Sequence, residues 1–171
     1  VANSLTFENA RAGILVINKR SSADKKTPLE GVTFKITTTD GKFLPDENGK
    51  VSSNGIYYTD ETGQIVLKGV VGSLVVTEVQ SIPGYTISDA NRTQTVVVNP
   101  DDTQTVYFYN DPLCSLTIEK YLETETGNQP LKGVTFLITD SSGAVIGPNN
   151  GECITGDDGR ITIDNLEPGT T

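Results

Sequence analysis

Apolar and polar residues alternate in short runs along most of the chain, a period typical of β-strands with one buried face. The run GILVINKR at Gly13–Arg20 places Leu15, Ile17 and Lys19 on the same face. An ammonium group without a partner is costly to bury, so a lysine in phase with apolar residues is predicted to change its charge state or to react. Lys19 is therefore the first candidate for chemistry.

The same alternation predicts an all-β chain with seven or eight short strands in its first two thirds and no helix. The expected strands lie near 14–19, 32–38, 56–59, 64–68, 73–80, 85–88, 93–99 and 104–110. Clusters of Asp, Asn, Gly and Pro mark the turns between them. Residues 20–28 are expected to form a surface loop, and residues 41–55 a longer loop or a small hairpin.

A sequence repeat organises the chain. Thr6–Lys19 aligns without gaps with Tyr107–Lys120, and Thr27–Thr37 aligns with Gln129–Thr139. The repeat unit is about one hundred residues long, a common size for a β-sandwich. In this alignment Lys120 is the copy of Lys19, and alternation places it on one face with Leu116 and Ile118, so it is likewise predicted to point into a core.

The repeat predicts three parts. Residues 1–12 match the last strand of a preceding module, residues 13–112 form one complete β-sandwich, and residues 113–171 match the first half of a following module. We therefore expect a segment of a longer tandem array whose second module is truncated. Interrupted modules are expected to leave unpaired strands and exposed apolar residues.

Two further polar residues share a face with apolar residues of their strands. Glu78 is in phase with Leu74 and Val76, and Asn110 is in phase with Phe108. Taken singly, the lysine, the glutamate and the asparagine each have an ordinary explanation, namely a snorkelling ammonium, an exposed edge and a turn cap. Together they place an amine, an acid and an amide on the first, a middle and the last strand of one predicted sandwich.

Composition narrows the chemistry. The chain has no histidine, which removes histidine-dependent nucleophiles and most zinc sites, and we expect no metal and no cofactor. A net charge of −9 argues against nucleic acid or an anionic membrane surface as partner, and no run has the length and apolar character of a membrane span. Cys114 and Cys153 allow either a disulfide or two buried thiols.

The order and spacing of these motifs resemble the CnaB-type domain, also called the SpaA-like or collagen-adhesin B-repeat domain, of Gram-positive surface adhesins and pilins. The matching stretches are VINK, PLEGVTF, YTDETGQIVLKGV, TEVQSIPGY and the closing YFYND. In that family a lysine and an asparagine join in an autocatalytic intramolecular isopeptide bond, assisted by an acidic residue. Carried over by position, the resemblance implies Lys19 as the amine, Asn110 as the acyl donor and Glu78 as the assisting acid.

The resemblance also implies a structural stalk of tandem β-sandwich modules with an Ig-like or transthyretin-like fold. Its parent protein is expected outside the cell, attached to the cell wall, with neighbouring modules of the array as partners. Because the bond forms once, the chain is not expected to be an enzyme with turnover. Two other functions stay open at this point: binding of a host protein or glycan, and service as an accessory module of a secreted enzyme.

The resemblance extends to the interrupted modules. Asn9 is the copy of Asn110 and Lys120 is the copy of Lys19, but neither has its own partner strand in this chain. We expect both to remain unreacted. The alternative is a head-to-tail assembly in which Asn9 of one copy meets Lys120 of another.

Overall fold

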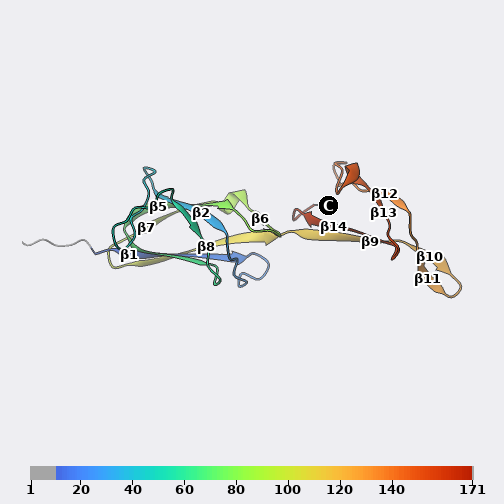
Figure 1. Cartoon of the computed structure of the whole chain (residues 1–171), viewed down its shortest axis with the longest axis horizontal. Helices are drawn as coiled ribbons and strands as arrows, with labels where there is room; N and C mark the ends of the chain where they lie inside the picture. The colour runs from blue at the N-terminus through green and yellow to red at the C-terminus, as the bar shows by residue number, and fades with distance from the viewer. Residues whose placement is uncertain (1–10, 171) are drawn as a thin grey trace, which may run out of the picture. The chain divides into compact units, whose positions relative to one another are not determined.

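The computed structural model describes residues 11–170, which divide into two compact units between Asp111 and Pro112 (Figure 1). Strands and turns make up both units, with two single-turn 3₁₀ helices, η1 (Asp89–Asn91) and η2 (Asn149–Gly151), in this part of the chain. None of the helices found between residues 11 and 170 has the length and apolar character to cross a membrane. The chain is therefore all-β, as the alternation predicts.

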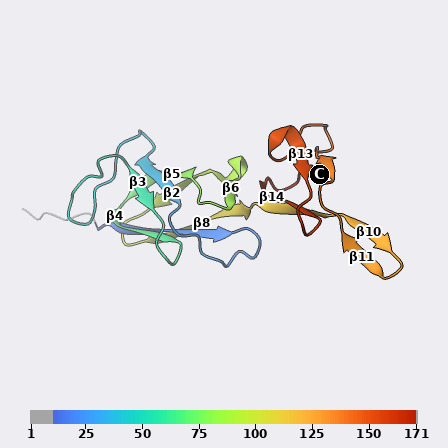
Figure 2. The same ribbon diagram turned by 45° about the vertical axis from the view of Figure 1, so that its right-hand side comes forward.

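The first unit is a sandwich of two four-stranded sheets, with strand orders β4-β1-β8-β6 and β3-β2-β5-β7 (Figure 1 and Figure 2). The strands are β1 (Gly13–Ser21), β2 (Thr33–Thr38), β3 (Ile56–Tyr58), β4 (Gln64–Val70), β5 (Gly72–Gln80), β6 (Tyr85–Ile87), β7 (Thr93–Val98) and β8 (Thr103–Pro112). Each strand overlaps one of the ranges expected from the sequence. Residues 41–55 form a loop with one isolated bridge between Pro45 and Val51.

The first and last strands of this unit lie side by side. Strand β1 pairs with β4 in the antiparallel direction and with β8 in the parallel direction. In the parallel pair Lys19 lies opposite Phe108, and Ser21 lies opposite Asn110. This pairing brings together two segments from opposite ends of the unit, and it places their inward-facing residues in one layer of the core.

The core fills the space between the two sheets. Leu15, Ile17 and Phe108 point inward from one sheet and meet Phe34 and Val76 from the other, and all five are buried. The rings of Phe34 and Phe108 pack edge to face with centroids 5.0 Å apart, which joins the two sheets at the level of Lys19. Burial of such apolar side chains supplies most of the driving force for folding.

The second unit consists of three two-stranded pairs, β14-β9, β10-β11 and β12-β13, among the described residues. Its strands are β9 (Cys114–Glu119), β10 (Tyr121–Thr124), β11 (Gly127–Pro130), β12 (Thr135–Leu137), β13 (Glu152–Ile154) and β14 (Arg160–Leu166), and Figure 2 shows β10 and β11 as a hairpin. A small core forms around Ile138, Cys153, Ile161 and Ile163.

The two units share side-chain hydrogen bonds as well as sequence. In the first unit Thr59 Oγ1 donates to the backbone carbonyl of Leu29 at 2.6 Å and accepts from the backbone N–H of Val32 at 3.0 Å. In the second unit Thr155 makes the same two bonds to the corresponding residues of the segment 131–134. The second unit therefore repeats local structure of the first.

The inner face of β9 differs from that of β1. Leu116 is 38% exposed whereas its copy Leu15 is fully buried, and Lys120 is exposed whereas Lys19 is buried. The prediction that alternation points Lys120 into a core is therefore wrong for this chain. The physical reason is the facing layer: the four-stranded sheet β3-β2-β5-β7 covers the inner face of β1, whereas within residues 11–170 the second unit forms only two-stranded pairs and has no such sheet to cover β9.

The two cysteines are free thiols. Cys114 is exposed at the start of β9, and Cys153 is buried in β13. The sequence allowed either a disulfide or two buried thiols. The structure has no disulfide between these cysteines, and only Cys153 is buried.

Candidate functional site

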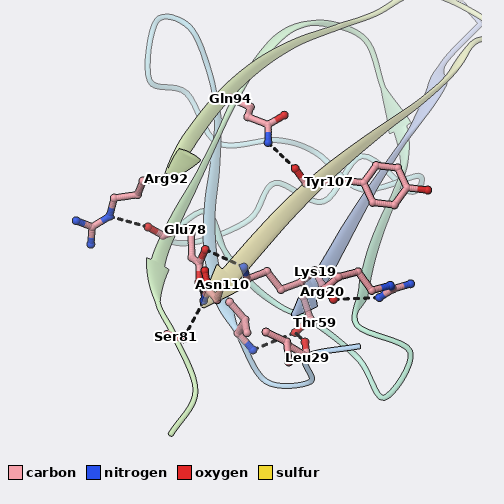
Figure 3. Close-up of polar contacts among 11 residues, drawn as sticks. Lys19, Arg20, Leu29, Thr59, Glu78, Ser81, Arg92, Gln94, Tyr107 and Asn110 are labelled. Atoms are coloured by element: carbon pink, nitrogen blue, oxygen red, sulfur yellow. Dashed lines mark hydrogen bonds and ion pairs between the residues drawn. The ribbon is translucent and has the colours of Figure 1, made fainter. Parts of the chain in front are cut away.

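Lys19, Glu78 and Asn110 come together in the core of the first unit (Figure 3). Lys19 projects from β1 and Asn110 from β8, which are neighbours in one sheet, and Glu78 projects from β5 in the facing sheet. Lys19 and Asn110 are 0% exposed, and Glu78 is 1% exposed. The three residues that alternation placed on inward faces therefore lie in one buried cluster.

The Glu78 carboxyl group lies between the amine and the amide. Its Oε2 is 3.4 Å from Lys19 Nζ, and its Oε1 accepts a hydrogen bond of 2.6 Å from Asn110 Nδ2. At 3.4 Å the first contact is an ion pair without good hydrogen-bond geometry. Lys19 Nζ and Asn110 Oδ1 have no hydrogen-bond partner among the described residues. Both atoms of the amine–amide pair therefore remain unsatisfied next to a shared carboxyl group.

Burial drives both ionisable groups toward their neutral forms. Loss of water lowers the pKa of Lys19 to about 8, although the nearby Glu78 carboxylate opposes the shift. Loss of water likewise raises the pKa of Glu78, against the opposing hydrogen bond from Asn110 and the charge of Lys19. A neutral amine is a nucleophile and a neutral carboxyl group is a proton donor, so the environment shifts each group toward its reactive form.

The backbone around Lys19 is held from both sides. Its N–H donates to the carbonyl of Gly63 at 2.8 Å, and its carbonyl accepts from the N–H of Leu29 at 3.1 Å and from the Arg20 guanidinium at 3.0 Å. Gly63 has φ of 67°, and a Cβ there would lie 2.6 Å from the Lys19 carbonyl oxygen. The close approach of this turn therefore requires glycine.

Arg92 holds the backbone of Glu78. The Glu78 N–H donates to the Arg92 carbonyl at 2.9 Å, and Arg92 Nε donates to the Glu78 carbonyl at 3.0 Å (Figure 3). On the other side of β5, Glu78 pairs with Phe34, next to a register shift between Thr33 and Phe34. A bulge of this kind re-aims side chains within a sheet.

Two residues that contact the cluster were not predicted from the sequence. Ser81 accepts a hydrogen bond of 2.8 Å from Asn110 Nδ2, and Arg92 makes the backbone contacts just described. Ser81 lies just after the end of β5, and Arg92 lies just before the start of β7. Because neither residue is part of a strand, alternation carries no information about where its side chain points. The single available signal was that Ser81 follows Glu78 closely in the chain.

The copies of the cluster residues behave differently. The Lys120 N–H donates to the Gly159 carbonyl and its carbonyl accepts from the Leu131 N–H, which repeats the backbone frame of Lys19. Its side chain is nevertheless exposed. Asn9 lies outside the described residues. No part of the cluster other than the lysine is therefore seen in the second unit as described.

The cluster can support one kind of chemistry. A neutral amine, a primary amide and an acid in contact with the amide nitrogen are the groups needed for an amine to replace ammonia on the amide carbon. The described residues contain no group of three or more His, Cys, Asp or Glu side chains arranged to hold a metal ion. The reaction that these side chains allow needs none.

Comparison with known proteins gives one family model and several solved structures. The model of the SpaA prealbumin-like fold domain matches residues 13–112 and, a second time, residues 114–171. The chain is 26% identical to GBS52, the minor pilin of Streptococcus agalactiae, with a TM-score of 0.52 over 64% of this chain and 48% of that one. No curated protein matches the sequence.

Two further structures share the fold at lower identity. A streptococcal ancillary pilin is 20% identical, with a TM-score of 0.55 over 94% of this chain and 52% of that one. The Bacillus anthracis TIE protein is 22% identical, with a TM-score of 0.50 over 90% of this chain and 27% of that one. The chain thus spans about half, or less, of the length of each of these proteins.

Proposed function

The chain belongs to the SpaA prealbumin-like fold family, and from this membership we propose that it is a structural segment of a Gram-positive cell-surface pilin or adhesin. Its similarity to the minor pilin GBS52 and the fold it shares with a streptococcal ancillary pilin support this role. Two successive matches to one family model support tandem modules, with neighbouring modules as partners. The similarity to a Gram-positive minor pilin supports an extracellular location, which we propose is on a parent protein attached to the cell wall.

The proposal includes an isopeptide bond between Lys19 and Asn110. A proton passes from Lys19 Nζ to Glu78, which leaves a neutral amine and a neutral acid. Nζ then attacks Cγ of Asn110, Glu78 gives its proton to Nδ2, and the Cγ–Nδ2 bond breaks as ammonia leaves. Nζ returns a proton to Glu78, so the products are one secondary amide and one ammonia. The bond forms once per chain, so the reaction is not enzymatic turnover.

The observation that carries the proposal is the complete burial of the three side chains around one carboxyl group. A buried ion pair is often no more stabilising than apolar residues of similar volume, because removing two charges from water is costly. Stability alone is therefore a weak reason for an amine and an acid in a sandwich core. Contact of the acid with both reacting nitrogens is what an amide-forming reaction requires.

A bond at this position would suit a protein under tension. Because β1 and β8 are parallel neighbours, force applied at Gly13 and Pro112 pulls these strands in opposite directions. With the cross-link in place, the force would run along β1 to Lys19, cross to Asn110 and leave along β8. The rest of the sandwich would lie outside the path of the load. This geometry supports a stalk that transmits force without unfolding.

The mass of the intact denatured chain tests the bond. We expect the wild type to weigh one ammonia less than its sequence, and the variants Lys19→Ala, Glu78→Ala and Asn110→Ala to show the full mass. Lys120→Ala is the matched control and should still lose one ammonia, because Lys120 is exposed and outside the cluster. A full mass for the wild type would reject the bond.

Peptide mapping of the same sample locates the bond. Digestion of the wild type is expected to release one branched peptide that contains both Lys19 and Asn110. A branched peptide that contains Lys120 instead would reject the assignment to the buried cluster. Covalent dimers that disappear in Lys120→Ala would support the head-to-tail alternative with Asn9.

A further inference from the structure

Ser81 is a fourth polar residue at the cluster. It follows directly after the end of β5, and it is partly buried whereas the three reacting residues are fully enclosed. Figure 3 shows Ser81 on one side of the Asn110 carboxamide and Lys19 reaching the cluster from another. Ser81 therefore contacts the acyl donor from the rim of the site.

Ser81 and Glu78 together determine how the Asn110 carboxamide is oriented. Nδ2 donates to Glu78 Oε1 at 2.6 Å and to Ser81 Oγ at 2.8 Å. A primary amide nitrogen has two hydrogens, so both are used. Oδ1 has no hydrogen-bond partner within residues 11–170. The orientation of the amide thus rests on the two acceptors at its nitrogen.

The two acceptors differ in how they respond to the reaction. In the proposed mechanism Glu78 takes a proton from Lys19 before the attack. A neutral carboxyl oxygen is a weaker acceptor than a carboxylate, so the hydrogen bond from Asn110 to Glu78 weakens at that moment. The Ser81 hydroxyl is uncharged throughout, and its bond to Nδ2 persists.

We propose that Ser81 is a positioning residue for the cross-linking reaction, which keeps Asn110 Nδ2 against the acid that protonates it. The inference rests on the proposed Lys19–Asn110 bond. It assigns the Ser81 hydroxyl no proton transfer and no covalent step. Its role is to hold the amide during the interval when Glu78 alone holds it poorly.

The test is the rate of ammonia loss in the full chain. Full-length chains are made by chemical synthesis in denaturant so that they have never folded, and their mass is checked to be that of the unreacted chain. They are then refolded by dilution, and the mass of denatured aliquots is followed with time. Ser81→Thr keeps the hydroxyl. Ser81→Val introduces a side chain of nearly the same shape as threonine but without the hydroxyl. We expect Ser81→Thr to react at close to the wild-type rate. Ser81→Val should react about tenfold more slowly, the rate equivalent of one hydrogen bond.

Circular dichroism and thermal unfolding of the same samples separate positioning from folding. A slow reaction in Ser81→Val with folding equal to that of Ser81→Thr supports the inference. Equal rates for the two variants would overturn the role of Ser81 without affecting the proposed bond. A slow reaction of Ser81→Val that is explained by incomplete folding would overturn that role in the same way. Absence of ammonia loss in the wild type would instead reject the proposed function on which the inference depends.

Discussion

Glu78 Oε2 lies 3.4 Å from Lys19 Nζ across the space between two facing sheets, and neither side chain reaches solvent. The two groups come from strands that are not neighbours, so the sandwich itself holds them together. Because burial lowers the pKa of Lys19 and raises the pKa of Glu78, transfer of a proton from the ammonium to the carboxylate costs less than it would in water. The proposed chemistry depends on this contact.

The rate of bond formation is predicted to have a bell-shaped dependence on pH. Below the raised pKa of Glu78 the pair holds two protons, and Lys19 is an ammonium that cannot attack. Above the lowered Lys19 pKa of about 8 the pair holds none, and Glu78 has no proton for the leaving nitrogen. The rate should therefore rise and then fall, with its maximum between these two limits.

The measurement is ammonia loss after refolding in buffers from about pH 4 to about pH 10, where the pair passes through all three protonation states. Circular dichroism at each pH controls for folding. A rate that keeps rising well beyond the Lys19 pKa of about 8 would show that the reaction needs no acid, and it would remove Glu78 from the mechanism.

Loss of the cross-link is predicted to destabilise the first unit. A bond that joins its first and last strands closes a loop that spans most of the unit, and cross-linking a loop near one hundred residues stabilises by roughly 4–5 kcal/mol. Lys19→Met removes the amine but keeps much of the apolar stem. We expect its free energy of unfolding in urea to fall by about this amount.

Lys120→Met is the matched control, because it makes the same change at the exposed copy of Lys19. Its unfolding should stay within about 0.5 kcal/mol of the wild type, as for most surface substitutions. If the two variants unfolded alike, the buried lysine would contribute no covalent closure.

Mechanical extension is predicted to separate the linked from the unlinked chain. When the full chain is pulled from its two ends, the first unit of the wild type should show no unfolding step, since the load bypasses most of its residues. In Asn110→Ala the same unit should unfold and lengthen by most of its contour. The second unit extends in both chains, and it serves as an internal control. A wild-type step of full unit length would contradict the proposed path of force.

Much of the first unit could be predicted from alternation alone. Every expected strand was found, and Lys19, Glu78 and Asn110 each lie on the inward face that their neighbours in sequence indicated. Alternation succeeds here because side chains of a strand point to opposite faces in turn, which is a local property of the backbone. The same rule failed for Lys120, since it assumes that a facing sheet covers the inner side of the strand, and the described second unit has no four-stranded sheet to do so.

Ser81 and Arg92 show where local rules end. Neither lies in a strand next to the site in sequence, and each reaches the cluster through a turn whose direction depends on tertiary packing. The free thiols of Cys114 and Cys153 are a similar case, because sequence spacing says nothing about the approach of their Cβ atoms. Such contacts are long-range, and they follow from the packing of the sheets.

The sequence by itself determined the strands of the first unit, the repeat, and which polar residues of the first unit face its core. Only the tertiary structure decided that β1 and β8 are parallel neighbours, that β5 lies across from them, and that one carboxyl group therefore contacts both an amine and an amide. The physical reason is that the face to which a side chain points is set by the few residues around it in the strand. Which strands pair, by contrast, is set by burial of apolar surface across the whole sandwich. The same lysine is thus enclosed in one unit and exposed in the other.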